Sequence, residues 1–272
     1  MLINGNMALM NHFKLRAAPF RWAPLALLAA MAGVLPAAPE GVNVILNEDF
    51  ESYTNTAAML AVWSGGSAVL ETAAPGGGKA ALHDGGDLNV SRVFSARPDA
   101  THNLVFSADL YDSATNAEKR VTIALRNTNG MNLEFGHINE TGPYSLRVVG
   151  FATPMEWTSF DSNLQPTRGW NRFQAVISMT NTVVTLDLGA KGKIDKTLTI
   201  DGPAPTTPFT NVRFGGLPGR ISHGGPVLFD NIKLALVPIG GPGVPAAGVG
   251  TRPISSTTNA PAGERRPGAT TQ

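Results

Sequence analysis

The chain of 272 residues contains no cysteine, which excludes disulfide bonds and cysteine-ligated zinc. It also lacks an excess of charge, since 21 basic residues stand against 20 acidic ones. No concentrated basic face is apparent, and such a face is needed to bind the phosphates of nucleic acid. Nucleic acid is therefore not an expected partner. A convincing helical period is missing as well. The chain must close on an ordinary hydrophobic core built from strands, and its length is sufficient for one.

The two ends of the chain differ in composition from its middle. Lys14, Arg16 and Arg21 precede an apolar, alanine-rich run at 22–35, which is typical of a secretory signal and shorter than the ~20 apolar residues that span a bilayer. We expect three parts: a signal peptide with a short linker at 1–41, one domain at 42–238, and a disordered Gly/Pro/Thr-rich tail at 239–272. This organisation predicts a secreted, periplasmic or cell-surface protein with no membrane span after signal cleavage.

Two alternating segments carry the clearest structural signal. Apolar side chains occupy every second position of 172–179, and the pattern returns in 182–188. Only Thr180 and Asn181 separate the two segments, which leaves room for a tight hairpin. Similar runs between Gly, Asn, Asp and Pro clusters predict further strands at 43–50, 67–71, 79–84, 88–95, 103–111, 119–127, 131–138, 144–152, 194–200, 210–215 and 227–237. The series predicts an all-β fold, an antiparallel β-sandwich.

Short motifs in these strands resemble a known superfamily. Gly-Trp-Asn-Arg-Phe at 169–173, Asn-Val-Arg-Phe-Gly-Gly at 211–216 and Phe-Asp-Asn-Ile at 229–232 resemble strands of concanavalin A-like or laminin G-like jelly rolls. Asn-Glu-Asp-Phe-Glu at 47–51 is similar to the first strand of bacterial secreted carbohydrate-binding modules. The resemblance covers 43–237 and implies a jelly roll whose partner is a polysaccharide or a cell-surface glycan.

The resemblance also implies a structural calcium ion, the only cofactor expected. In such folds the first and last strands lie side by side, which would bring Glu48 and Glu51 toward Asp230. Carboxylate oxygens are the ligands that calcium requires. The alternative is that Glu48 and Asp49 are solvated edge charges and that Asp230 pairs with a backbone amide.

Strand alternation places a set of polar side chains away from the expected core: Asp109, Tyr111, Arg126, Glu134, Arg147 and Gln174. We predict that they share one ligand-binding face, where charged groups contact sugar hydroxyls or uronate carboxylates and Tyr111 or Tyr144 stacks on a sugar ring. Trp157, in an expected loop, is a further stacking candidate, whereas Trp63 and Trp170 are expected in the core. The alternative is a solvated face with cross-strand ion pairs.

No complete catalytic motif is present. The Glu-x-Asp-x-x-Glu run of concanavalin-like glucanases has its nearest match between Glu134 and Glu140, where the central Asp is missing. Lyases of similar fold use a Tyr or His base with Arg or Gln, but His137 shares the core side with Leu133 and Phe135. We therefore expect a secreted, non-catalytic module that binds glycans or surface components. A lyase or glycoside hydrolase acting on the polar face, and an envelope or matrix structural protein, are the alternatives.

Overall fold

The computed structural model describes residues 41–240, except residues 67, 84–87, 114–119, 131, 139–141, 166 and 217–225. Residues 1–40 and 241–272, which hold most of the expected signal segment and tail, lie outside the described residues, as does Glu140. More than half of the described chain is in strands, and there is one short helix, α1 (Thr56–Leu60).

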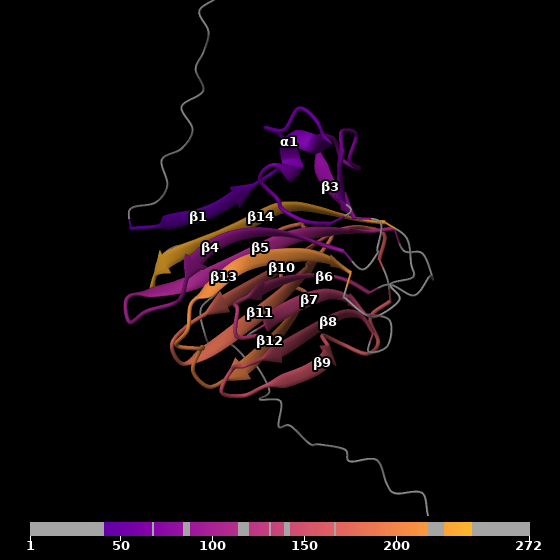
Figure 1. Cartoon of the computed structure of the whole chain (residues 1–272). Coiled ribbons are helices and arrows are strands. Elements are labelled where there is room, and N and C mark those ends of the chain that lie inside the picture. The colour runs from indigo at the N-terminus through magenta and orange to yellow at the C-terminus, as the bar shows by residue number, and fades with distance from the viewer. Residues whose placement is uncertain are drawn as a thin grey trace, which may run out of the picture. The chain divides into compact units, whose positions relative to one another are not determined.

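The strands form two antiparallel sheets (Figure 1). The larger sheet has the order β12 (Lys196–Asp201), β11 (Asn181–Leu188), β10 (Gly169–Ile177), β5 (His102–Asp112), β14 (Val227–Pro238), β3 (Ala80–His83) and β2 (Ala68–Glu71), and β1 (Asn43–Glu48) also pairs with β14. The smaller sheet has the order β4 (Asn89–Ala96), β13 (Phe209–Gly216), β6 (Arg120–Arg126), β7 (Asn132–Ile138), β8 (Gly142–Val149) and β9 (Met155–Ser159). The predicted antiparallel β-sandwich is confirmed.

Aromatic side chains from both sheets fill the space between them. The ring of Phe135 in β7 stacks on that of Phe173 in β10 with centroids 4.9 Å apart, and Phe106 in β5 lies 5.3 Å from Phe135. All three side chains are fully buried. Because burying one Phe contributes about 1.5–3 kcal/mol relative to exposing it, this cluster fixes the two sheets face to face.

The predicted hairpin forms from β10 and β11. The pairing runs in unbroken antiparallel register over the two strands, and the backbone N–H of Ser178 donates to the carbonyl of Asn181 at 2.9 Å. The Ser178 hydroxyl also accepts the backbone N–H groups of Thr180 and Asn181, at 3.1 and 3.0 Å. This serine therefore fixes where the chain reverses. Met179, expected on the core face, lies in the turn and is 46% exposed.

β1 ends at Glu48 in a buried polar corner. One carboxylate oxygen of Glu48 accepts the N–H of Phe50 at 2.9 Å, and the other accepts Tyr53 Oη at 2.7 Å, Trp63 Nε1 at 3.1 Å and Arg92 Nη1 at 2.8 Å. The bonds hold Phe50 in a left-handed conformation with φ of 57°, which is uncommon outside glycine. Glu48 is 4% exposed, so it is an anchor of the fold and no solvated edge charge. The expected burial of Trp63 is confirmed.

The first and last strands lie side by side, as expected. β1 pairs antiparallel with β14, from Asn43 opposite Leu236 to Glu48 opposite Ile232 (Figure 1). Every strand predicted from the sequence has a counterpart in the structure. Two elements were missed: α1, which is five residues long and capped by Asn55, and β9, whose residues were expected to form a loop.

Candidate functional site

The predicted polar residues do lie outside the core, but the sandwich divides them between two opposite surfaces. Asp109 and Tyr111 in β5 and Gln174 in β10 point outward from the larger sheet. Arg126, Glu134 and Arg147 in β6, β7 and β8 point outward from the smaller sheet. The expected single face, with Gln174 as part of its wall, is therefore wrong. Alternation separates inside from outside, but it does not reveal which sheet a strand joins.

On the smaller sheet, three arginines surround one carboxylate. We name the outward side chains of Thr122, Arg126, Glu134, Arg147 and Arg213 the arginine face. Glu134 is fully buried although it points outward, and it accepts a hydrogen bond from the Thr122 hydroxyl. The three arginines are half-buried. A charge in this position is shielded from water, so its electrostatic interactions are stronger than those of a freely solvated side chain.

Register places these side chains in rows across the sheet. Ala124 of β6 lies opposite Arg213 on one side and opposite Glu134 on the other, and Glu134 lies opposite Arg147. The row crosses four strands, which corresponds to about 14 Å at about 4.8 Å per strand spacing. Arg126 belongs to the next row, diagonal to both Arg213 and Glu134. Ala124 itself is 1% exposed, so its longer neighbours cover it.

Two guanidinium groups of the arginine face keep an unused donor. The Nε atoms of Arg126 and Arg147 are shielded from solvent and have no hydrogen-bond partner among the described residues. Arg147 Nε lies 3.6 Å from Oε2 of Glu156, which is too long for a hydrogen bond, and the Glu156 side chain is 88% exposed. Each Nε–H is therefore an unsatisfied donor that lies beneath the surface of the arginine face.

Arg213 belongs to this surface and was not selected from the sequence. Burial lowers the pKa of Arg213, and the nearby charge of Arg126 lowers it further, while Glu134 acts in the opposite direction. The alternation of Val212 and Phe214, both fully buried, could have shown that Arg213 points outward. Its position beside Arg126 depends on the pairing of β13 with β6, which are about 85 residues apart and not linked by a local pattern.

On the larger sheet, the outward charged residues have partners within the fold. Arg172 binds both oxygens of Asp109, and Asn231 Nδ2 donates to Asp109 Oδ2 at 3.0 Å. Asp187 accepts the backbone N–H groups of Lys191 and Gly192 at 3.0 and 2.6 Å. These charged groups have partners within the fold, so the predicted binding residues Asp109 and Gln174 lie on a surface whose ionic groups are already engaged.

The predicted calcium ligands do not form one set. Glu48 directs its carboxylate into the buried corner, whereas Glu51 Oε1 accepts the N–H of Lys79 at 2.6 Å. Asp230 accepts the N–H of Asn231 at 2.7 Å. Burial raises the pKa of Asp230 to about 6, and the negative charges of Asp109, Asp49 and Glu51 contribute to the rise. Within the described ranges, no group of three or more His, Cys, Asp or Glu residues is placed to hold a metal ion.

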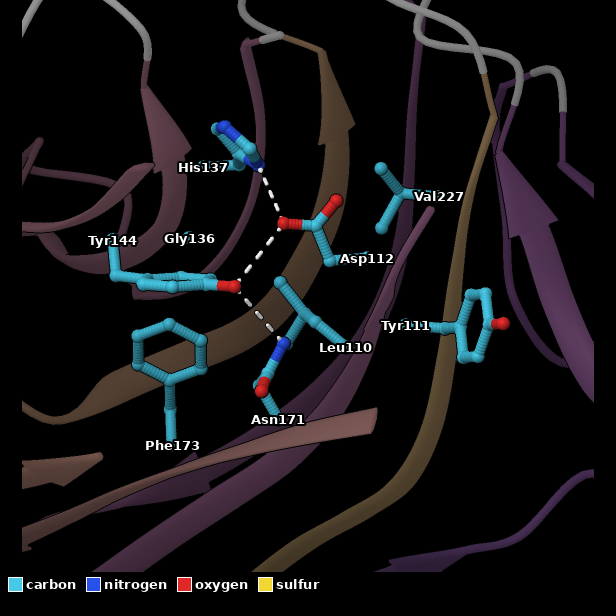
Figure 2. A pocket seen from close by; sticks show the side chains of 9 residues that line it. All are labelled: Leu110, Tyr111, Asp112, Gly136, His137, Tyr144, Asn171, Phe173 and Val227. Atoms are coloured by element: carbon cyan, nitrogen blue, oxygen red, sulfur yellow. Dashed lines mark hydrogen bonds and ion pairs between the residues drawn. The ribbon is translucent and has the colours of Figure 1, made fainter. Parts of the chain in front are cut away.

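A small cavity lies inside one end of the sandwich. It is lined by Leu110, Tyr111, Asp112, Gly136, His137, Tyr144, Asn171, Phe173 and Val227 (Figure 2). Asp112 Oδ2 lies 3.4 Å from His137 Nδ1 and accepts the Tyr144 hydroxyl at 3.2 Å, and Asn171 Nδ2 donates to that hydroxyl at 3.3 Å. About 10 Å³ is open to the centre of a water molecule, which is room for roughly one water. The cavity is too small for a sugar ring.

These cavity residues settle two expectations. His137 is 5% exposed and lies on the core side, as predicted. Tyr144, one of the two suggested stacking residues, is 3% exposed, and burial raises its pKa. A tyrosine enclosed in this way has no free ring face, so the expectation that Tyr144 stacks on a sugar is wrong.

The tryptophans other than Trp63 depart from expectation. Trp170 does not enter the main core: it lies opposite Tyr111 on the outer surface of the larger sheet, with ring centroids 5.3 Å apart, and its Nε1 donates to the carbonyl of Pro75 at 2.7 Å. Trp157 lies in β9, beside the strand that carries Arg147, and it is half-buried. Trp157 is therefore at the margin of the arginine face and only partly accessible.

In the part of the chain that the structure describes, no helix has the length and apolar character needed to cross a membrane.

No protein-family model matches the chain, and no curated protein matches it. Among solved structures it is similar to a carbohydrate esterase from the Shiga toxin-encoding bacteriophage phi24B, with TM-score 0.44 and 12% identity over 72% of this chain and 99% of that one. It is also similar to domain 4 of AbnA, a GH43 extracellular arabinanase from Geobacillus stearothermophilus, solved with arabinotriose, with TM-score 0.45 and 12% identity over 72% of this chain and 92% of that one.

A third similar structure is the exoplasmic/lumenal domain of VIP36, a concanavalin A-like lectin solved with Ca²⁺ and Man3GlcNAc. Its TM-score is 0.42, with 14% identity over 65% of this chain and 85% of that one. The two antiparallel sheets of this chain form the sandwich that the resemblance to concanavalin A-like jelly rolls implies.

Proposed function

We propose that this chain is a non-catalytic module that binds glycans through the arginine face. The observation that supports the proposal is the pair of buried Nε–H groups of Arg126 and Arg147 without an acceptor among the described residues. A buried donor left unpaired costs about 1–3 kcal/mol. Sugar hydroxyls and ring oxygens are acceptors that would relieve this cost, and they lie along an extended chain that suits a row of side chains crossing several strands.

The other two surfaces offer less to a glycan. The ionic groups on the larger sheet bind one another, and the interior cavity has room for about one water molecule. A ligand on the larger sheet would have to break the Arg172 to Asp109 pair, whereas a ligand on the arginine face would add partners to groups that need them. The balance favours the smaller sheet.

The non-catalytic part of the proposal follows from the same geometry. Glycoside hydrolysis uses two carboxyl groups on either side of the scissile bond. Glu134 is fully buried and bound by Thr122, and the His137 and Tyr144 side chains, which could serve a lyase as bases, lie inside the sandwich. Incubation with alginate, pectin, laminarin and xylan, followed by assays for unsaturated ends and reducing sugar, should give no product. Product from any of them would establish a polysaccharide-active enzyme.

Binding is tested on the same polysaccharides by affinity electrophoresis and titration calorimetry. Arg147→Ala should weaken binding about tenfold or more, because a hydrogen bond to a charged group contributes about 1.5–3 kcal/mol. Gln174→Ala, on the opposite surface, is the matched control and should bind as the wild type does. Loss of binding in Gln174→Ala alone would move the site to the larger sheet. No binding to any glycan, on an array as well, would overturn the proposal and favour an envelope or matrix structural role.

Export is a separate part of the proposal. The basic residues Lys14, Arg16 and Arg21 before the apolar run at 22–35 support a secreted, periplasmic or cell-surface location. Expression of the full chain in a bacterial host, with N-terminal sequencing of the product, should find a new N-terminus after Ala32 or Ala38. Recovery of the intact chain in the cytoplasm would contradict export.

A further inference from the structure

Among the described residues, the arginine face carries more positive than negative charge. Arg126, Arg147 and Arg213 share this face with one enclosed carboxylate, that of Glu134, while Glu156 stands at the margin and is mostly in solvent. Three cations around one anion leave a positive excess in a setting that is partly removed from water. Repulsion between such groups is stronger than it would be between solvated side chains.

The repulsion is concentrated between Arg126 and Arg213. They occupy diagonal positions on neighbouring strands, where Cβ atoms are roughly 7–8 Å apart. Burial lowers the pKa of Arg213, and the charge of Arg126 adds to that effect. The two cations are therefore close enough to destabilise each other, and an anion bound by both would remove that repulsion.

A carboxylate fits the donor geometry of these arginines. A guanidinium group presents its donors in a plane that matches the two oxygens of a carboxylate, and charge-assisted bonds of this kind are roughly twice as strong as neutral ones. The unused Nε–H of Arg126 would gain an acceptor, and the excess charge would be reduced. Neutral sugar hydroxyls could satisfy the donor, but they would leave the charge excess in place.

We propose that the glycan bound by this chain is a uronate, and that Arg126 and Arg213 hold a sugar carboxylate between them. The inference rests on the proposed function and narrows it to one chemical class. Arg213 is the residue that distinguishes acidic from neutral sugars, whereas Arg147, paired across from Glu134, contacts the chain at its other side.

The test compares each uronate with its own uncharged form. Titration calorimetry uses oligogalacturonate and alginate oligosaccharides, their methyl esters, and dextran with dextran sulfate. The wild type should bind a free uronate at least about tenfold more tightly than its methyl ester, the factor expected for one charge-assisted pair. Added salt should weaken binding of the free acid and leave the ester unaffected, because only the charged interaction is screened.

Variants then assign the effect to named residues. Arg213→Gln should lose at least about tenfold in affinity for the free uronate and clearly less for the ester, so that its preference for the acid over the ester falls. Arg213→Lys keeps the positive charge but lacks the planar guanidinium group. Its affinity for the free uronate should therefore lie between those of the wild type and Arg213→Gln. The matched control is Arg168→Gln, which removes the same charge from the side of Tyr111 on the other surface. A thermal melt of each variant confirms that the sandwich is intact.

The outcomes separate the two proposals. Equal affinity for free and esterified uronates, or binding confined to neutral glycans, overturns the uronate assignment and leaves glycan binding standing. Binding confined to dextran sulfate overturns the carboxylate assignment in favour of sulfated sugars. Equal losses in Arg213→Gln for acid and ester would show that Arg213 has no part in charge selection. Absence of binding to every ligand overturns both proposals.

Discussion

Arg172 and Asp109 form a bidentate ion pair across the ladder of β5 and β10. Nε and Nη2 of the arginine lie 2.7 Å from different oxygens of the carboxylate, and the two residues are directly opposite in register. The Asp109 side chain is 5% exposed and that of Arg172 is 40% exposed. The hydrogen bond to Asp109 raises the pKa of Arg172. A buried carboxylate on the outside of the larger sheet is thus held by one cation.

This pair should be strongly coupled in a double-mutant cycle. Arg172→Ala should lower the free energy of unfolding by about 2 kcal/mol, less than for a fully buried pair, because it leaves the Asp109 carboxylate enclosed without its cation. Combining it with Asp109→Ala should cost about 1–3 kcal/mol less than the sum of the single changes. Urea unfolding measures all three variants. Additive costs would show that the pair contributes no energy of its own.

The buried corner at the end of β1 should be more sensitive than any surface carboxylate. Glu48→Ala removes the acceptor of Trp63, Tyr53, Arg92 and the Phe50 N–H, and it should lower the free energy of unfolding by about 3–5 kcal/mol. Asp201→Ala, at an exposed strand end, is the control and should change it by less than about 0.5 kcal/mol. Chemical denaturation measures the free energy of unfolding of both variants. Equal losses in Glu48→Ala and Asp201→Ala would show that the buried corner does not stabilise the fold.

Asp230 should make the fold less stable at neutral pH than under mild acid. Burial raises its pKa from 3.8 to about 6, so the folded state binds a proton that the unfolded state releases. Its contribution to stability is fully present below pH 3.8 and is lost as pH rises to about 6. Asp230→Asn should therefore raise the free energy of unfolding at pH 7 by about 1–2 kcal/mol, allowing for partial exposure, and the gain should vanish near pH 4.

The control for this prediction is Asp187→Asn. Asp187 accepts two backbone N–H groups with both carboxylate oxygens, so losing one oxygen should destabilise the protein at pH 7. Unfolding is followed in the presence of a chelator, to exclude metal effects. If Asp230→Asn raises the free energy of unfolding equally at pH 4 and pH 7, the gain does not come from titration of the Asp230 carboxyl.

Calcium binding stays a prediction with a direct test. If the acidic residues near Asp230 rearrange to bind the ion, calcium should raise the melting temperature relative to chelator, because a ligand that binds only the folded state stabilises it. Asp230→Asn should abolish the difference. Identical melting temperatures with calcium and with chelator would show that calcium does not stabilise the folded chain.

The sequence predicts the elements well because each depends on a local pattern. Alternating apolar residues, as in Phe173 and Ala175, are visible within one strand, and all strands of this kind were located. The sequence does not reveal β9 because its alternation of apolar and polar residues, which includes Trp157, lasts only four residues, and because the strand pairs through an irregular register with β8. α1 was missed because five residues are too few to display a helical period.

The candidate site could be predicted only in part, because it depends on contacts between distant strands. Arg126 and Arg147 were selected because they alternate with core residues. Their separation from Gln174 follows from sheet order, and the addition of Arg213 follows from the pairing of β13 with β6. No property of a single strand specifies its neighbours, so the composition of a face that crosses several strands is a tertiary result.

The pairing of β1 with β14 brings the two ends of the domain to one corner. Asn43, where β1 begins, lies opposite Leu236, two residues before β14 ends. Polypeptide on either side of the domain is therefore attached at a single place on the larger sheet. Such a unit can be inserted into a surface loop of another protein, or tethered by both ends, without stretching its linkers.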